Sequence, residues 1–378
     1  MIPVFRPSMD ANEEQALIET IRSGWIGNGP KTKEFENRFA DLINVPHAIA
    51  LNSATAALHL AMVLADVKGN EVITTPMTFV STNHAILYAG GIPVFVDIEP
   101  DTLNIDPELI ELSITEKTKA VIVVHYGGHS CKMDRINQIA KKHNLLLIED
   151  VAHGTGGKYK TSMLGSIGDF GCFSFHAVKN LATGDGGMLT CKNDEYANRA
   201  RKLSWMGISR GTWDRVDGEE YSWKYDVEEL GFKYQMNDIA ASIGLVQLSK
   251  LDEVNEIRRH LAERYSEGLG DLDWIKVPKE KEYAKSSWHN YVIKVNDSTI
   301  RNPLIDHLKN SGISTGMHYI PNHLYTMYKP YVKQSLPIAE KLWQELITLP
   351  LFPDLSVQDQ DRIISSIRDF AKQGHQKR

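Results

Sequence analysis

The sequence has little cysteine and no long hydrophobic run, and both absences restrict the class of protein. Cys131, Cys172 and Cys191 are odd in number and widely separated, so they form neither a disulfide framework nor a C-x-x-C metal knuckle. The longest apolar stretches, such as 120–124 and 145–148, are far shorter than a membrane span. No secretory signal is visible at the N-terminus. These features predict a cytoplasmic protein without a membrane partner.

Positive charge is also in short supply. The 42 Lys and Arg residues are outnumbered by 48 Asp and Glu residues, which gives a net charge of −6, and there is no basic block. Proteins that bind a nucleic-acid backbone usually carry a clustered positive surface, so no nucleic-acid partner is expected. With 27 Gly and 15 Pro in 378 residues, the chain is neither collagen-like nor mainly disordered.

The common nucleotide- and metal-binding motifs are missing as well. Gly154, Gly156 and Gly157 precede Lys158, but the spacing of a P-loop is absent, and no G-x-G-x-x-G follows a strand. There is no H-E-x-x-H motif and no EF-hand loop, so no metal site is predicted. NAD-linked, P-loop and zinc-hydrolase functions are therefore disfavoured.

What the sequence does contain is a regular alternation of strands and helices over its first two-thirds. The apolar runs predict strands at 47–51, 71–75, 92–96, 120–125, 145–149, 172–174 and 187–190. Helical patterns lie between them at 54–65, 83–89, 107–112, 133–143 and 194–204. Near-continuous apolar strands separated by helices indicate an α/β fold with a mostly parallel sheet covered on both faces.

The last third has a different pattern. A long helix is predicted at 239–268, followed by a strand at 290–295 and helices at 303–310 and 339–347. We therefore expect a large domain over residues 1–245 and a smaller α+β domain over 246–378. The polar, aromatic segment 207–225 is either a functional loop or a merely solvated one.

Four positions directly after predicted strands carry groups suited to a ligand, because ligands bind beyond the carboxyl ends of such strands. Residues 52–58 (NSATAAL) open a helix and are either an anion site or a plain N-cap. Phe79 either stacks on a flat cofactor or fills the core. Asp150 either holds a ring nitrogen, a sugar hydroxyl or a metal, or serves as a cap or ion pair. Lys179 is either a Schiff-base amine or a solvated charge.

Together these groups are what pyridoxal 5'-phosphate (PLP) requires. The chain resembles the DegT-type nucleotide-sugar aminotransferases, a branch of the fold-type I, aspartate-aminotransferase-like enzymes. The resemblance covers nearly the whole chain and is carried by SGWIGNGPK (23–31), NSATAAL, TPMTFVSTNHAI (75–86), IEDVAHGTGGKYK (148–160), GDFGCFSFHAVKNLATGDGGM (168–188), GFKYQMNDIAASIGLVQL (231–248) and HYIPNH (318–323). It implies a mostly parallel seven-stranded sheet flanked by helices, and PLP as the cofactor.

The resemblance also implies the cofactor contacts. The PLP phosphate is implied to be bound by Ala54, Thr55 and Ser174. The pyridine ring is implied to contact Phe79, Asp150 and His153, and the Schiff base is implied to form on Lys179.

Residues outside this set are implied to act across subunits or on the substrate. Lys233 stands where many family members have an Asn that reaches the phosphate bound by the neighbouring subunit, and Asn237 is an alternative for that contact. An ammonium can also serve a phosphate, so a homodimer with shared active sites is expected. Trp25 and His323 are expected to contact the substrate, and 318–319 to border the same site.

The implied function is transfer of an amino group from L-glutamate to a nucleotide-linked keto-sugar in amino-sugar and polysaccharide biosynthesis. The sequence GFKY at 231–234 and the 207–225 segment favour amination at C-4 of a UDP-4-keto-6-deoxy amino sugar. Amination of a 3-keto-sugar is the alternative. A PLP-dependent sugar dehydratase is disfavoured by Lys179, which such enzymes replace, commonly by His. A regulatory protein of the same fold is disfavoured by the complete set of Thr55, Asp150, Ser174 and Lys179.

Overall fold

The computed structural model describes residues 1–208, 216–217, 220–221 and 225–372, so most of the 207–225 segment lies outside the described residues. The larger part of the molecule is built on a seven-stranded sheet with the order β1-β9-β8-β5-β4-β2-β3. The strands are β1 (His47–Leu51), β2 (Glu71–Thr74), β3 (Ile92–Phe95), β4 (Thr118–Val124), β5 (Leu146–Asp150), β8 (Phe170–Ser174) and β9 (Gly187–Cys191). Only β9 runs against its neighbours, which confirms the mostly parallel sheet.

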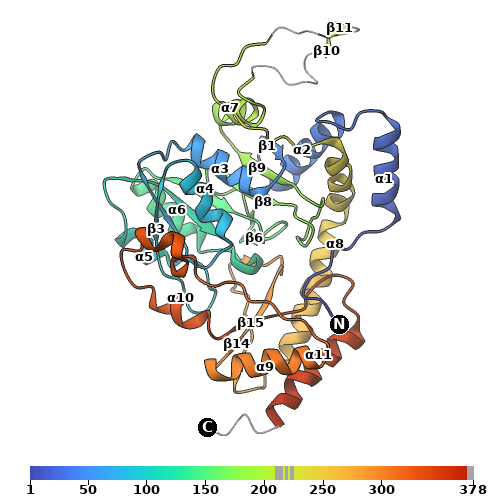
Figure 1. The fold of residues 1–378 in the computed structure, drawn as a ribbon, viewed down its shortest axis with the longest axis vertical. Helices are drawn as coiled ribbons and strands as arrows, with labels where there is room; N and C mark the ends of the chain where they lie inside the picture. The colour runs from blue at the N-terminus through green and yellow to red at the C-terminus, as the bar shows by residue number, and fades with distance from the viewer. Residues whose placement is uncertain (209–215, 218–219, 222–224, 373–378) are drawn as a thin grey trace.

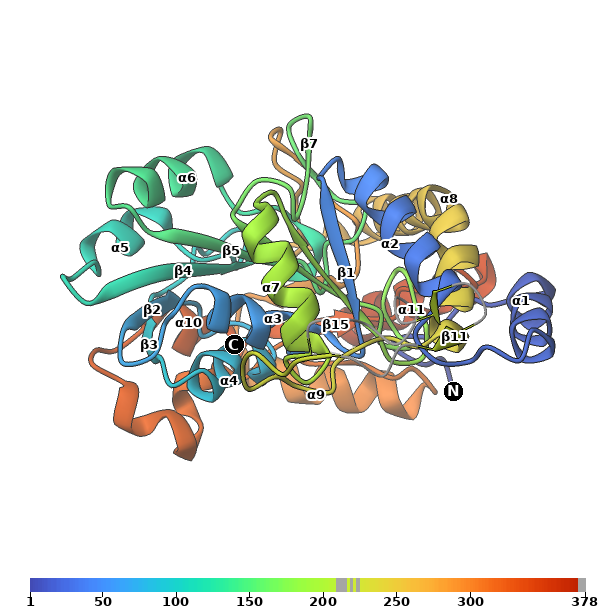
Figure 2. The ribbon, with the colours of Figure 1, turned by 90° about the horizontal axis from the view of Figure 1, so that it is seen from above.

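Helices cover both faces of this sheet, as expected from its apolar strands (Figures 1 and 2). Along β4, Val121 and Val123 point into one core, and Ala120 and Ile122 point into the other, because side chains alternate along a strand. The first core is closed by α2 (Pro30–Ile43), α5 (Pro107–Leu112) and α6 (Met133–Lys142). The second is closed by α3 (Ala54–Leu64), α4 (Val80–Tyr88) and α7 (Asp194–Ser204).

A smaller α+β part follows α8 (Asp238–Leu269), a long helix that Figure 1 shows running from α1 (Ala11–Arg22) and α2 towards α9 (Ser298–Asn310) and α11 (Val357–Phe370). Its antiparallel sheet consists of β12 (Ile275–Lys276), β14 (Tyr291–Val295) and β15 (Leu346–Leu349). The expected domain boundary after residue 245 falls inside α8. Leu245 packs in the core of the large part, and Tyr265 packs in that of the small part.

The helix predicted over 339–347 is wrong in its second half. The helix there is α10 (Pro337–Leu342); residues 343–345 form a turn, and β15 begins at Leu346. Ile347 pairs with Ile293, and Leu349 pairs with Tyr291, all of them fully buried. Burial and pairing against β14 therefore decide the structure of a segment whose apolar spacing also suits a helix.

The remaining short elements connect these parts. A three-stranded sheet joins β13 (Ala284–Lys285) to β6 (Lys158–Tyr159) and β7 (Ser162–Met163), which ties the small part to the large one. The others are β10 (Val216–Asp217), β11 (Glu220–Tyr221) and the 3-10 turns η1 (Tyr126–Gly128), η3 (Asn322–Leu324) and η4 (Thr326–Tyr331). Within the described ranges, no helix is long and apolar enough to cross a membrane.

Candidate active site

The strand ends of the large sheet place a buried carboxylate at the centre of the candidate site. Asp150 is the last residue of β5 and is only 2% exposed. One carboxylate oxygen accepts a hydrogen bond from the Thr82 hydroxyl at 2.7 Å, and the other accepts one from the Ala152 amide at 3.0 Å. Burial raises the pKa of Asp150. A buried carboxylate of this kind is stabilised when a cation faces it.

Thr82 is itself oriented by a second hydroxyl. The Thr78 and Thr82 hydroxyls lie 2.7 Å apart, and both side chains are buried. Because Thr82 donates its only hydroxyl proton to Asp150, Thr78 is the donor in this pair. The two threonines therefore form a short chain of donors that ends on the carboxylate.

Lys179 lies in the connection between β8 and β9 and is half-buried. Desolvation lowers the pKa of this lysine to about 8. Its ammonium nitrogen is 3.4 Å from Nε2 of His289, a residue of the small part that is 2% exposed. A lysine with such a pKa carries a substantial neutral fraction near physiological pH and can act as a nucleophile or base.

The tautomer of His289 follows from its other neighbour. The amide nitrogen of Asn180 donates to Asn255 and to the Ser287 carbonyl, so its amide oxygen is left as an acceptor. That oxygen lies 3.2 Å from Nδ1 of His289, which therefore carries the proton. Nε2 is then an acceptor that faces Lys179. Burial lowers the pKa of His289 well below its usual value, so the ring is neutral.

His153 adds a second neutral imidazole next to His289. The ring centroids lie 4.5 Å apart. Nδ1 of His153 accepts from the Gly127 amide at 3.3 Å, which leaves Nε2 to donate to the Tyr319 hydroxyl at 3.0 Å. Burial lowers the pKa of His153 well below its ordinary value.

Phe79 is the exposed aromatic group of the site. It is the N-cap residue of α4, and 59% of its side chain is exposed although it is surrounded by buried elements. Its ring centroid is 6.4 Å from that of Tyr319. An exposed phenyl ring beside a buried carboxylate offers an apolar face to a flat cofactor.

An anion site lies at the N-terminus of α3. Ser53 caps this helix by accepting from the Ala56 amide, and the amides of Ala54 and Thr55 in the first turn have no intrahelical partner. Ser174 is paired across the sheet with Gly187. A Cβ atom on Gly187 would lie 2.3 Å from the backbone of Ser53, so the strand and the turn are in direct contact. Ser174 is thereby brought near the turn at Ala54.

The chemical groups of these residues match those that PLP requires. The free amides of α3 suit its phosphate, Phe79 suits the face of its ring, Asp150 suits a protonated ring nitrogen, and Lys179 suits its aldehyde. The strongest sign of fit is the buried carboxylate of Asp150 at the end of β5, because a protonated ring nitrogen would be stabilised next to it.

Lys233, Asn237 and Trp25 form a separate group at the start of α8. The Lys233 ammonium lies 3.7 Å from the centroid of the Trp205 ring, and the Asn237 side chain caps α8 by accepting from Ala240. Trp25 donates to the Asn28 carbonyl. Asp238 holds the N-terminal segment in place through the Gly29, Lys31 and Thr32 amides and the Thr32 hydroxyl.

His323 has a different environment from the one expected of a substrate ligand. It is 4% exposed, lies beside Phe95, and pairs with Glu340 at 3.2 Å. Tyr319 of the same segment is the residue that contacts His153.

Thr82 and His289 are the site residues that the sequence analysis did not single out. Thr82 stands one helical turn after Phe79, a spacing that points to a shared face. His289 directly precedes a predicted strand, but nothing local connects it to Lys179, which lies 110 residues earlier.

Comparison with known proteins agrees with this geometry. The DegT/DnrJ/EryC1/StrS aminotransferase family matches residues 7–368. The chain is 41% identical to the spore coat polysaccharide biosynthesis protein SpsC of Bacillus subtilis over 379 aligned positions, which cover 98% of this chain and 97% of SpsC.

Solved structures show the same fold. The PLP form of Spr1654 from Streptococcus pneumoniae superposes with a TM-score of 0.91 and 36% identity, covering 98% of this chain and 99% of that one. Helicobacter pylori PseC, an aminotransferase involved in the biosynthesis of pseudoaminic acid, superposes with a TM-score of 0.91 and 27% identity, covering 98% and 99%. The chain belongs to the DegT/DnrJ/EryC1/StrS family and is a PLP-dependent sugar aminotransferase.

Proposed function

We propose that this enzyme transfers the amino group of L-glutamate to C-4 of a UDP-linked 4-keto-6-deoxy amino sugar. The observation that carries the proposal is the half-buried Lys179, with a pKa of about 8, in a site that also holds the buried Asp150 and the exposed Phe79. The GFKY motif and the similarity to PseC and SpsC support an amino sugar of a surface polysaccharide as the product.

Lys179 moves the proton in this proposal. When bound, PLP would supply an acceptor for the electron pair of the substrate carbon and a carrier for the amino group between glutamate and the keto-sugar. The neutral Nζ of Lys179 removes the proton from the substrate carbon, and the resulting ammonium later delivers it. His289 accepts a hydrogen bond from Nζ and so holds it in position. Thr82 and Ala152 donate to the two oxygens of Asp150 and so oppose the effect of burial, which raises the pKa of this carboxyl group.

The assembly proposed here is a homodimer with shared active sites in the cytoplasm. The segment that contains Lys233 is hydrogen-bonded to Asn52, just before the α3 turn, through its backbone. The Lys233 side chain lies over Trp205 instead of over that turn. Such a side chain is free to serve a phosphate held by the neighbouring subunit. Trp25 lies in the segment docked on the same end of α8 and is proposed to contact the sugar nucleotide there.

The first experiment tests the catalytic assignment. Lys179→Ala is expected to abolish turnover and the visible Schiff-base absorption, because Lys179 is the lysine whose charge acts on Asp150. Borohydride reduction followed by peptide mass spectrometry should attach the cofactor to Lys179 in the parent enzyme alone. Undiminished transamination by the variant would contradict the proposal.

The second experiment tests the substrate. The enzyme is assayed with glutamate and a panel of UDP-, GDP- and dTDP-linked 4-keto and 3-keto sugars, and the product is analysed by NMR. Amination at C-4 of the UDP sugar is expected. A 3-amino product, or a deoxy-keto product without nitrogen, would instead identify a 3-keto-sugar aminotransferase or a dehydratase.

A further inference from the structure

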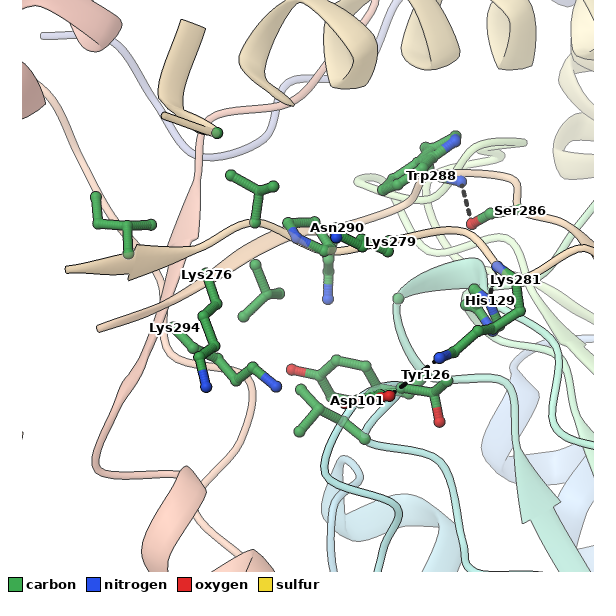
Figure 3. A pocket seen from close by; sticks show the side chains of 18 residues that line it. Asp101, Tyr126, His129, Lys276, Lys279, Lys281, Ser286, Trp288, Asn290 and Lys294 are labelled. Atoms are coloured by element: carbon green, nitrogen blue, oxygen red, sulfur yellow. Dashed lines mark hydrogen bonds and ion pairs between the residues drawn. The ribbon is translucent and has the colours of Figure 1, made fainter. Parts of the chain in front are cut away.

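A cavity of about 580 Å³ opens between the large and small parts of the molecule, next to the candidate active site (Figure 3). Its walls come from the loop at 101–103, the turn at 126–129, β12, β14 and the segment between those two strands. Lys179, Asp150 and Phe79 do not line it. The volume lies within the usual range for small-molecule sites, and the proposed transamination does not use it.

The wall of this cavity is strongly positive. Its lining carries four lysines, Lys276, Lys279, Lys281 and Lys294, against a single carboxylate, Asp101, in a chain whose net charge is −6. Asp101 is already paired with Lys281 at 3.0 Å. Lys276 and Lys279 have no ion-pair partner among the residues that the structure describes. The excess of positive charge is therefore local and is not neutralised by the chain.

Lys294 shows that these lysines affect one another. Burial lowers the pKa of Lys294, and the nearby Lys276 and Lys281 ammonium groups add to the decrease, while Asp101 and Glu345 oppose it. Its ammonium donates to the Pro100 carbonyl. Like charges converging in a partly desolvated cavity repel, and an anion placed among them relieves this repulsion.

Asn290 supplies an independent sign of a missing ligand. It is 4% exposed, and neither its amide nitrogen nor its amide oxygen has a partner. Figure 3 shows its side chain pointing into the cavity. An unpaired buried amide destabilises the fold, so its position suggests that a polar partner belongs there.

We infer that the cavity binds a small polyanion through Lys276, Lys281 and Lys294, with the Asn290 amide donating to one of its oxygens. A polyphosphate and a polycarboxylate share the required chemistry. The site adjoins the cofactor pocket through Gly127, whose carbonyl accepts a hydrogen bond from the backbone N–H of Asn290 while its own backbone N–H donates to His153. Binding there and the transamination proposed above are independent and are measured separately.

Calorimetric titration of the PLP-loaded enzyme with pyrophosphate, and separately with citrate, tests the inference. We expect saturable binding of one equivalent per chain by at least one of them. Pyrophosphate alone would identify a phosphate ligand, and citrate alone a carboxylate ligand. Binding of neither overturns the inference.

Lys276→Met and Asn290→Leu locate the site. Each is expected to weaken binding about tenfold, because each removes one hydrogen bond to a charged group. Lys309→Met on the exposed face of α9 removes the same charge elsewhere and should change affinity less than about twofold. Equal weakening by Lys309→Met would show non-specific attraction and contradict the inference.

The Asn290→Leu variant also separates binding from folding. Leucine has the same branched arrangement of four side-chain heavy atoms and removes the unpaired amide, so the thermal unfolding temperature should be unchanged or higher. Binding that survives both this substitution and Lys276→Met overturns the inference even though the enzyme stays folded.

Discussion

At the scale of single residues, the decisive property is the proton affinity of Lys179. Its pKa of about 8 results from desolvation, against about 10.4 for a free lysine. Only the neutral amine attacks an aldehyde, so the rate at which apoenzyme takes up PLP should rise with pH and level off above pH 8. Stopped-flow absorbance across pH 6 to 11 measures this rate. A midpoint near that of free lysine would contradict the assignment.

Thr82 gives a second prediction at this scale. Thr82→Val keeps the volume but removes the hydroxyl that donates to Asp150. Because that donor stabilises the ionised carboxylate, its loss raises the pKa of Asp150 and should lower kcat about tenfold, equivalent to about 1.4 kcal/mol.

Thr82→Ser is the matched control, since serine retains the donor. It should keep most of the activity. If serine and valine variants lose activity equally, the residue serves packing and not the carboxylate.

The element scale shows what the sequence could predict. Asp150 ends an apolar strand and Lys179 follows one, so local pattern and the rule that ligands lie beyond strand ends were enough to single them out as candidates, whereas Ser174 came from the family resemblance alone. His289 was not predictable, because its contact with Lys179 depends on how the small part docks on the large one. The strand at Leu346–Leu349 was mistaken for helix for a similar reason, since its partner β14 is far away in the chain.

Gly187 gives a prediction at the scale of elements. A methyl group there would lie within 2.5 Å of the Ser53 and Ala54 backbone, so Gly187→Ala must push the start of α3 away from β9. We expect a loss of about 1–3 kcal/mol in the free energy of unfolding. PLP should bind more weakly as well, because the displaced turn carries the free amides.

Gly27→Ala is the control for this variant. Gly27 has no atom within 4 Å of a built Cβ and no left-handed backbone, so its substitution should change stability by less than about 0.5 kcal/mol. Chemical denaturation of apoenzyme and fluorescence titration with PLP measure both effects. Normal PLP affinity in Gly187→Ala would show that the turn does not hold the phosphate.

At the scale of the whole molecule, α8 joins the two halves of the enzyme. Its first turn anchors the N-terminal segment through Asp238, and its last turns pack in the core of the small part through Tyr265 and Leu269. The chain start is fixed to the small part by the bridge from Ile2 to Ile313. Lys233 and Trp25 lie in segments held at the first turn of α8, and the proposal assigns Lys233 to the site of the neighbouring subunit, apart from the Lys179 of its own chain.

That separation predicts complementation between defective subunits. Lys179→Ala and Lys233→Ala are each expected to be impaired, and a mixture refolded together should form mixed dimers. If Lys233 serves the neighbouring subunit, each mixed dimer has one intact site, and activity should return to about one quarter of the parent level at random association. Mixing Lys179→Ala with Asp150→Asn should restore nothing, because both residues act in the site of their own chain and each site of the mixed dimer therefore carries one of the two defects. If neither mixture regains activity, Lys233 acts in the site of its own chain.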